Sequence, residues 1–252
     1  QAATLYADTN GDGVTDTITS VATSANNYVQ IYHPNIGTTS YYNFGSGLTS
    51  FGMVGTTDAN GQVGQEVVIR ATSAFNSVIY TINDARQTTQ RYDFGSGLAN
   101  FSVVGISNNT DGFAGNEIIV RTDSSGTIPT TSLSIIDDRR AVKRQYNFGT
   151  GLSSVKVVSI TDTNGLAGDE IVMQLESSSG IRTIAIQIID DAKATTRQYN
   201  QSSNLTSFTV LGVRNYDGLA GAEVCYRAST STYTYYQMII DRNGSVVSRS
   251  SC

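Results

Sequence analysis

The chain has 252 residues, a formal net charge of −5, and charged side chains at only 15% of its positions. Nucleic-acid binding requires a basic face, so a sparsely charged acidic chain excludes that class of partner. One histidine and two cysteines cannot build a zinc site of the Cys/His type. No apolar run reaches the roughly 18 residues that a membrane span needs, so no membrane insertion is expected.

The N-terminal loop 8–16 carries the clearest chemistry. It reads Asp-Thr-Asn-Gly-Asp-Gly-Val-Thr-Asp, which puts oxygen-bearing side chains at loop positions 1, 3, 5 and 9 and glycine at position 6. This spacing matches the first nine positions of a helix-flanked calcium loop, where position 7 offers a backbone carbonyl. The alternative is a metal-free turn held by Asx hydrogen bonds. The predicted calcium ligands are Asp8, Asn10, Asp12, Val14 and Asp16.

One phrase then recurs along the chain, a Tyr-x-Phe-Gly-x-Gly-Leu tail in three copies and one degraded copy. Each tail precedes a short apolar run and then a turn-rich loop similar to 8–16, so five units fill the chain. Each unit holds four short runs rich in β-branched and aromatic residues, which predict strands. The tyrosines that mark the tails recur at intervals of 50 to 54 residues and are Tyr42, Tyr92, Tyr146 and Tyr199.

Four strands in each unit, repeated about every 50 residues, are typical of a β-propeller. We therefore predict an all-β fold, a five-bladed β-propeller with four antiparallel strands per blade. The blades would form one domain that closes into a ring and needs no end caps. The expected units are residues 1–49, 50–99, 100–153, 154–206 and 207–252.

The later loops depart from the calcium pattern of loop 8–16. Loop position 5 carries an apolar side chain in the last three copies, and position 9 becomes glutamate in all four. Fewer oxygen ligands leave a weaker case for calcium in loop 58–66 and little case in the others. We expect Phe113, Leu166 and Leu219 to dock into the blade interface. We expect hydrogen bonds to loop backbone from Glu66, Glu117, Glu170 and Glu223.

The motif of residues 8–16, followed by a β-branched strand, resembles the FG-GAP/VCBS repeats of integrin-like propellers. The strict match covers this loop alone, and the looser unit covers nearly the whole chain. The resemblance implies bound calcium, an extracellular setting, and a role in adhesion or ligand binding. Five blades depart from the seven usual in such propellers, and the loops at 109–117, 162–170 and 215–223 lack the calcium pattern.

The two cysteines bear on the compartment. A secreted chain with two cysteines usually pairs them. However, Cys225 lies near the start of a second strand, and Cys252 follows the fourth strand, at the expected opposite end of the last blade. A disulfide needs Cα atoms within about 7 Å, so the tail must turn back or both thiols stay free. The first residue is Gln1, which leaves open whether a secretory leader has been removed.

Catalytic constellations are not expected. His33 is the sole histidine, and we expect it to be a turn residue. The carboxylates recur at equivalent places in the repeats, whereas acid–base catalysis needs unlike groups at defined separations. We therefore expect a protein that is not an enzyme. A glycosidase-type five-bladed enzyme is the less favoured alternative.

Tyrosine and neutral polar residues suit carbohydrate recognition, because a phenol ring covers a sugar face and hydroxyl groups bond its edges. The leading hypothesis is thus adhesion to a carbohydrate or a surface glycoprotein. Tyr41 and the four tail tyrosines are candidate contacts unless they pack between blades. The cluster 233–236 should leave at least one tyrosine exposed. The alternative is self-association through edge strands into a surface or filamentous assembly.

Overall fold

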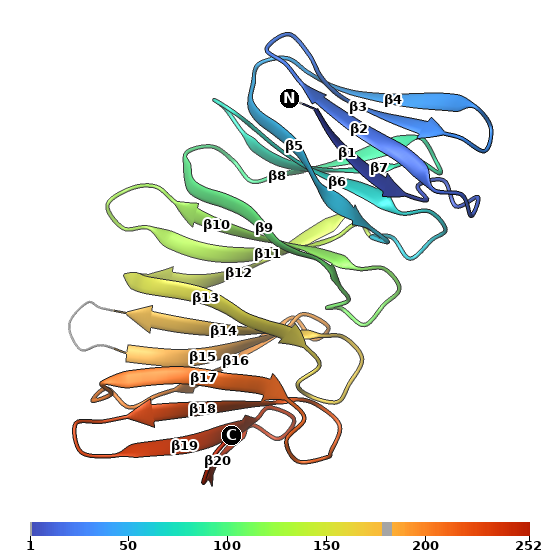
Figure 1. The fold of residues 1–252 in the computed structure, drawn as a ribbon. Helices are drawn as coiled ribbons and strands as arrows, with labels where there is room; N and C mark the ends of the chain where they lie inside the picture. Colours follow the sequence, from blue (N-terminus) through green and yellow to red (C-terminus); the bar gives the residue numbers. More distant parts are fainter. Residues whose placement is uncertain (1, 178–182) are drawn as a thin grey trace. The chain divides into compact units, whose positions relative to one another are not determined.

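The structure, a computed structural model, describes residues 2–177 and 183–252. Gln1 and part of the fourth expected unit, residues 178–182, lie outside this range. The described residues form twenty strands, grouped into five sheets of four antiparallel strands (Figure 1). They contain no helix long and apolar enough to cross a membrane. The predicted all-β class and the five four-stranded blades are confirmed, and ring closure stays a prediction.

Within every sheet each strand pairs with the next along the chain. The first blade contains β1 (Ala2–Ala7), β2 (Asp16–Ala22), β3 (Asn27–His33) and β4 (Thr38–Gly45). The second contains β5 (Leu48–Thr57), β6 (Glu66–Ser73), β7 (Ser77–Asn83) and β8 (Thr88–Asp93). The third contains β9 (Leu98–Asn108), β10 (Glu117–Ser124), β11 (Thr130–Asp137) and β12 (Val142–Thr150).

The fourth blade contains β13 (Leu152–Thr161), β14 (Glu170–Ser177), β15 (Thr183–Asp190) and β16 (Thr195–Asn200). The fifth contains β17 (Ser207–Arg214), β18 (Glu223–Ser229), β19 (Thr234–Ile240) and β20 (Ser245–Arg249). The second, third and fourth blades begin two residues before the predicted boundaries, because the leucine of the tail phrase already starts the first strand.

The chain divides into two compact units. The first comprises Gln1–Ser107 and Ala114–Phe148, and the second comprises Asn108–Phe113 and Gly149–Cys252. The first unit thus holds most of the first three blades, and the second holds the last two blades.

The core of each unit lies between consecutive blades. In the first unit, Ile18 and Ile31 of the first blade pack with Val67 and Ile69 of the second, and all four are fully buried. In the second unit, the fourth and fifth blades pack in the same manner. Alternate residues of a strand point to opposite faces, so a blade between two others buries both its faces.

The tail tyrosines belong to this core. All four are less than 10% exposed. The Tyr92 hydroxyl donates a 2.6 Å hydrogen bond to Asp138, which lies in the turn after the third strand of the next blade. Tyr42 and Tyr199 donate in the same way to the equivalent carboxylates, Asp84 and Asp241. The hypothesis that the tail tyrosines contact carbohydrate is therefore wrong, because Tyr42, Tyr92, Tyr146 and Tyr199 are all buried. Packing between blades is confirmed for Tyr42, Tyr92 and Tyr199.

Phe113, Leu166 and Leu219 do not dock into the blade interface. Their exposed fractions are 53%, 54% and 57%, which contradicts the prediction. The alanine after each lies against a glycine of the preceding loop, although it is itself exposed: a Cβ on Gly165 would lie 3.0 Å from the carbonyl oxygen of Ala220. The two loops approach so closely that no space remains between them for the larger side chain, which faces solvent.

Consecutive loops are also joined through their backbones. The amide of the eighth loop position donates to the carbonyl of the first position in the preceding loop. These hydrogen bonds are 2.6–2.9 Å long and run from Gln65 to Asp8, from Asn116 to Asp58, from Asp169 to Asn109 and from Ala222 to Asp162. The repeated loops therefore hold neighbouring blades together whether or not they resemble a calcium site.

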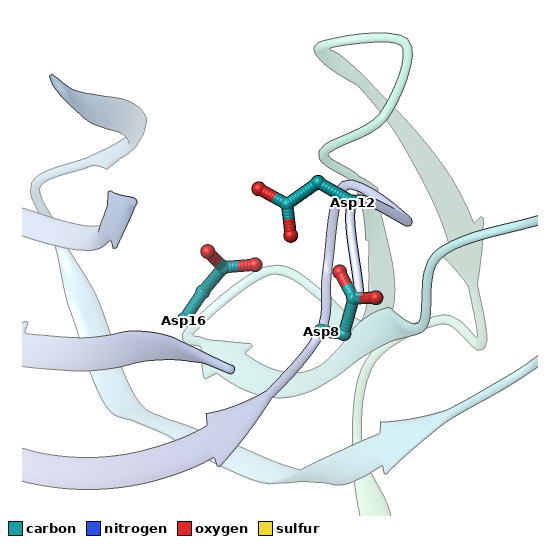
Figure 2. Close-up of side chains that lie close together, drawn as sticks. All are labelled: Asp8, Asp12 and Asp16. Carbon is teal, nitrogen blue, oxygen red and sulfur yellow. The ribbon is translucent and has the colours of Figure 1, made fainter. Parts of the chain in front are cut away.

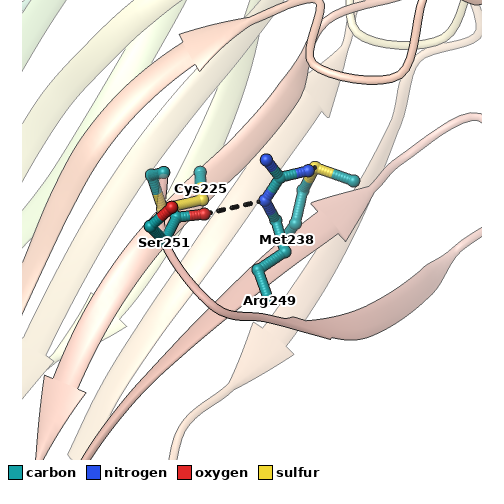
Figure 3. Close-up of a disulfide and its surroundings, with 5 residues drawn as sticks. Cys225, Met238, Arg249 and Ser251 are labelled. Atoms are coloured by element: carbon teal, nitrogen blue, oxygen red, sulfur yellow. Dashed lines mark hydrogen bonds between the residues drawn. A yellow bond between two sulfur atoms is a disulfide. The ribbon is translucent and has the colours of Figure 1, made fainter.

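Cys225 and Cys252 form a disulfide, with Cα atoms 6.0 Å apart. Cys225 pairs with Met238, and Met238 pairs with Val247, so Cys225 lies opposite the middle of β20. After β20 the chain turns back, and the Arg249 side chain donates to the Ser251 carbonyl oxygen at 2.9 Å (Figure 3). The expected separation at opposite ends of the blade is therefore wrong, because the returning tail closes the gap.

Candidate metal centre

Loop 8–16 connects the first two strands, and its three aspartates converge as the sequence predicts. One carboxylate oxygen from each of Asp8, Asp12 and Asp16 lies within 4.8 Å of the others (Figure 2). Gly11 and Gly13 have φ angles of 78° and 83°, which L-residues with a Cβ seldom adopt. These glycines let the chain wind tightly enough to bring positions 1, 5 and 9 together.

Backbone amides of the loop bind the same carboxylates. The two oxygens of Asp8 each accept a 2.8 Å hydrogen bond, from the amides of Gly11 and Gly13. Asp12 accepts one from the amide of Val14 at 2.8 Å, and this bond lowers the pKa of Asp12. Asx turns are thus present, as the metal-free alternative requires. They do not exclude a cation, because each carboxylate oxygen has a second lone pair.

The donor chemistry fits a hard cation. Carboxylate, amide and carbonyl oxygens are the ligands that calcium and magnesium prefer. Three carboxylates so close together repel one another, and a bound cation relieves that repulsion. Asn10 directs its side-chain oxygen into the loop, where it accepts the Asp12 amide at 3.2 Å. Val14 contributes its amide to the loop, and its carbonyl stays a predicted ligand.

The buried end of this loop continues into a network that the sequence did not reveal. Asp16 is fully buried, and its carboxylate lies 3.1 Å from Nδ1 of His33. Nε2 of the same ring lies 3.2 Å from Asp84 of the second blade. The prediction that His33 is a turn residue is wrong, because it ends β3 and is 4% exposed. Strand alternation after the buried Val29 and Ile31 was the available signal.

Thr9 couples the loop to the second blade. Its amide donates to Asp16 at 2.9 Å, and its hydroxyl lies 2.7 Å from Asp84. Asp84 in turn accepts the hydroxyl of Tyr42 at 2.5 Å. The position of the candidate metal loop therefore depends on the same carboxylate that binds the first tail tyrosine.

His33 also lies near a serine. Ser40 Oγ is 3.2 Å from Nε2, so that Asp16, His33 and Ser40 follow the order of a hydrolytic triad. However, Nε2 also contacts Asp84, and the buried imidazole faces partners at both nitrogens. This geometry supports a structural joint between two blades.

Glu66 and Glu223 bind loop backbone, as predicted. The same prediction is wrong for Glu170, because neither of its buried side-chain oxygens accepts a hydrogen bond. Glu66 accepts the amides of Ala59 and Asn60 at 2.8 and 3.0 Å. Its longer side chain reaches these amides from within the interface, and burial raises its pKa to about 8. Among the described residues, Asp8, Asp12 and Asp16 are the only three carboxylates grouped closely enough to share an ion. Loop 58–66 therefore lacks such a cluster.

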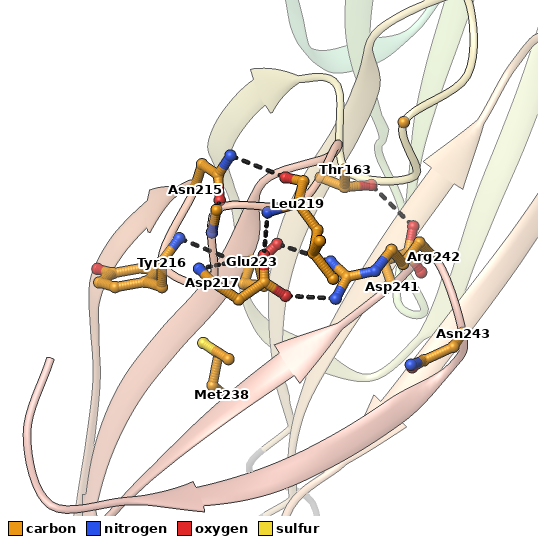
Figure 4. Close-up of polar contacts among 12 residues, drawn as sticks. Thr163, Asn215, Tyr216, Asp217, Leu219, Glu223, Met238, Asp241, Arg242 and Asn243 are labelled. Atoms are coloured by element: carbon orange, nitrogen blue, oxygen red, sulfur yellow. Dashed lines mark hydrogen bonds and ion pairs between the residues drawn. The ribbon is translucent and has the colours of Figure 1, made fainter.

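In the last loop, 215–223, an arginine side chain supplies the positive charge. Arg242 pairs with Glu223 at 3.2 Å and also contacts Asp217, as Figure 4 shows. The guanidinium thus neutralises two carboxylates of loop 215–223. The network extends to the fourth blade, where the Thr163 hydroxyl donates to Asp241 at 2.7 Å. An ion pair here takes the role that a metal would have in loop 8–16.

Comparison with known proteins adds no family assignment. The relationship to FG-GAP/VCBS repeats rests on the sequence motifs and stays a prediction. The chain matches no protein-family model and no curated protein sequence.

Proposed function

We propose that this protein is a non-enzymatic, extracellular β-propeller of the FG-GAP/VCBS type that acts in adhesion or in binding a glycan or similar ligand. Calcium in loop 8–16 would stabilise it. The observation that carries the proposal is the convergence of Asp8, Asp12 and Asp16 within 4.8 Å. The disulfide between Cys225 and Cys252 is compatible with an oxidising, extracellular compartment.

Calcium binding is tested by thermal unfolding with calcium or with a chelator. A ligand that binds only the folded state adds about 2.7 kcal/mol at a concentration 100 times its Kd, which raises the melting temperature by several degrees. Asp12→Ala should abolish this rise, because it removes a carboxylate ligand at an exposed position without disturbing the core. Gln62→Ala, at the equivalent exposed position of the next loop, is the matched control and should keep the calcium-dependent rise. If calcium does not shift the melting temperature of the unaltered protein, the calcium site is rejected.

Binding is tested on a glycan array in calcium and in chelator, alongside sedimentation velocity. We expect a monomer that binds at least one glycan. The second candidate function is a subunit of an assembly, favoured by the exposed valines of the edge strand β20, Val246 and Val247. Oligomers without glycan binding would support the assembly and overturn the adhesion proposal.

A further inference from the structure

A pocket of about 370 Å³ lies at the joint between the first and second blades. Its wall is made by the connection from β4 to β5, by the hairpin of β6 and β7, and by one residue of β8. All the residues that line it belong to the first compact unit. We call it the Tyr80 pocket, and the lining residues that define its chemistry are Phe44, Phe75, Asn76, Tyr80 and Arg91.

Aromatic side chains form much of the apolar surface of the Tyr80 pocket. The rings of Phe44 and Tyr80 contact each other, with centroids 4.7 Å apart and planes inclined by 58°. Phe75 stands at the tip of the β6–β7 hairpin and is 88% exposed. A side chain so exposed contributes little to the core, so its place in the wall of a pocket suits contact with a ligand.

The turn that carries Phe75 is held by its own hydrogen bonds. The hydroxyl of Ser73 accepts the amides of Phe75 and Asn76 at 3.2 and 3.1 Å. The amide of Ser73 donates to the carbonyl of Asn76 at 2.8 Å, and the Asn76 side chain donates to Asp93 at 2.7 Å. The backbone at Phe75 is therefore fixed before a ligand arrives, which lowers the entropic cost of binding.

A polar group stands beside the rings. The guanidinium carbon of Arg91 lies 5.8 Å from the centroid of the Tyr80 ring, and a 2.9 Å ion pair with Asp93 fixes Arg91 in this position. Asp93 and the Tyr80 hydroxyl engage Nε and Nη1 of Arg91, so further N–H groups of the guanidinium can donate to a ligand. The ion pair leaves this side of the pocket without net charge.

The strand register identifies the position of Tyr80 in the other blades. Tyr80 pairs with Ile69, the fourth residue of the second strand of its blade. In the other four blades the residues opposite that fourth position are polar and not aromatic, namely Gln30, Ser134, Gln187 and Gln237. Packing between blades therefore does not require an aromatic ring at this position, and Tyr80 is specific to the second blade.

The next joint, between the second and third blades, has a smaller pocket of about 190 Å³. It contains Phe94, the counterpart of Phe44 in the tail phrase, and it has Ser134 in place of Tyr80. The ammonium group of Lys143 lies 4.4 Å from the centroid of the Phe94 ring and so occupies the face of that ring. The aromatic surface that a ligand can reach is therefore larger in the Tyr80 pocket.

We propose that the Tyr80 pocket binds a neutral sugar ring of a glycan, which stacks on Tyr80 and Phe75 and accepts hydrogen bonds from Arg91. Aromatic rings cover the apolar face of a sugar, and a few placed polar groups fix its hydroxyls. The volume lies at the lower end of the roughly 300–1,000 Å³ that small-molecule sites occupy, and the neutral ion pair gives no preference for an acidic sugar. This inference rests on the proposed binding function and gives it a site and a class of ligand.

The test is binding of the full chain to beads that carry one sugar each, namely glucose, galactose, mannose, fucose, N-acetylglucosamine or N-acetylgalactosamine, with sialic acid as the charged comparison. We expect binding to at least one neutral sugar and none to sialic acid. Phe75→Ala should weaken this binding about tenfold, since one aromatic contact contributes up to about tenfold. Phe113→Ala, at a 53% exposed phenylalanine of loop 109–117, is the matched control and should bind normally.

Tyr80→Gln is the second variant. It introduces the side chain that the first, fourth and fifth blades already have at this position, so the blade is expected to fold. It should weaken binding at least tenfold, because it removes the ring beneath the sugar and the partner of Arg91. Circular dichroism and thermal unfolding check that each variant is folded.

The other outcomes decide against the inference. If the unaltered protein binds a glycan on the array or a sugar on the beads, and both folded variants bind it equally, the Tyr80 pocket is not the site, although the proposed function stands. If the unaltered protein binds nothing in either assay, both proposals fail. Binding to sialic acid alone would overturn the assignment to a neutral sugar.

Discussion

At the scale of single residues, the hydroxyl of a tail tyrosine joins the first blade to the second, the second to the third, and the fourth to the fifth. Tyr92 and Thr81 both donate hydrogen bonds to Asp138. Burial raises the pKa of Asp138, and these two hydrogen bonds partly oppose that rise. The carboxylate is buried at 4% exposure, so it depends on both donors for its solvation. The tyrosine therefore contributes through its oxygen as well as its ring.

Tyr92→Phe should lower the free energy of unfolding by about 1–3 kcal/mol, because it leaves a buried carboxylate with one donor fewer. Chemical denaturation measures the change. Tyr41→Phe, at a 62% exposed position, is the control and should stay within about 0.5 kcal/mol of the unaltered protein. Equal effects of the two substitutions would show that the hydrogen bond to Asp138 contributes nothing.

Glu170, a second single residue, makes the stability of the folded protein depend on pH. It is 1% exposed, and neither of its oxygens accepts a hydrogen bond. Burial raises its pKa from 4.5 to about 8, with further contributions from Asp190 and Asp162. The folded state therefore keeps a proton that the unfolded state releases, so this contribution to stability falls as the pH rises from 4.5 to about 8.

Glu170→Gln replaces the protonated carboxyl by a neutral group of the same shape. At pH 8 it should stabilise the protein by about 1–3 kcal/mol, and at pH 4.5 it should have little effect. Thermal unfolding across this range measures both. Glu223→Gln, which loses the ion pair with Arg242, should instead destabilise the protein at pH 8. A pH-independent effect of Glu170→Gln would contradict the assignment.

At the scale of elements, the loops between the first and second strands are the repeated contact between blades. Gly165 and Gly218 occupy the same position in the fourth and fifth loops, with φ angles of 77° and 78°. A Cβ on Gly165 would meet the carbonyl of Ala220 at 3.0 Å, whereas a Cβ on Gly218 would meet nothing within 4 Å. Alanine substitutions at these two glycines therefore separate the cost of backbone strain from the cost of pushing two loops apart.

Gly218→Ala should cost about 1 kcal/mol from its positive φ alone. Gly165→Ala should cost this amount and about 1–2 kcal/mol more, because the added methyl pushes the fifth loop away. Thermal unfolding of the two variants gives the difference directly. Identical costs would mean that the loops yield without loss and do not hold the blades together.

At the scale of the whole molecule, the disulfide ties the C-terminal tail to the last blade. The two cysteines are 27 residues apart in the sequence. The tail that they hold lies over a face of the last blade on which Cys225 and Met238 are almost fully buried. The tail thus shields apolar atoms that would otherwise face water.

Cys225→Ala/Cys252→Ala should lower the free energy of unfolding by about 2–4 kcal/mol, since it frees the tail in the unfolded and folded states. Thermal unfolding with and without a reductant measures this. The reductant should destabilise the unaltered protein and leave the double variant unchanged. Alkylation of two free thiols in the native, unreduced protein would contradict the disulfide.

The sequence by itself determined the features that depend on local spacing. The five repeats follow from a phrase that recurs every 50 to 54 residues. The four strands in each repeat and the aspartates at positions 1, 5 and 9 of the first loop follow from spacing within about ten residues, because strand pleating and tight turns are local. These predictions hold for the twenty strands and for the convergence of Asp8, Asp12 and Asp16.

Only the tertiary structure decided which of these residues meet across blades. The Tyr42 to Asp84 bond spans 42 positions, and the position of His33 depends on the same carboxylate. Repetition alone could not show that Leu166 faces solvent, or that the tail returns to Cys225. Contacts between blades join residues far apart in the chain, and a pattern within one strand contains no information about what covers each face.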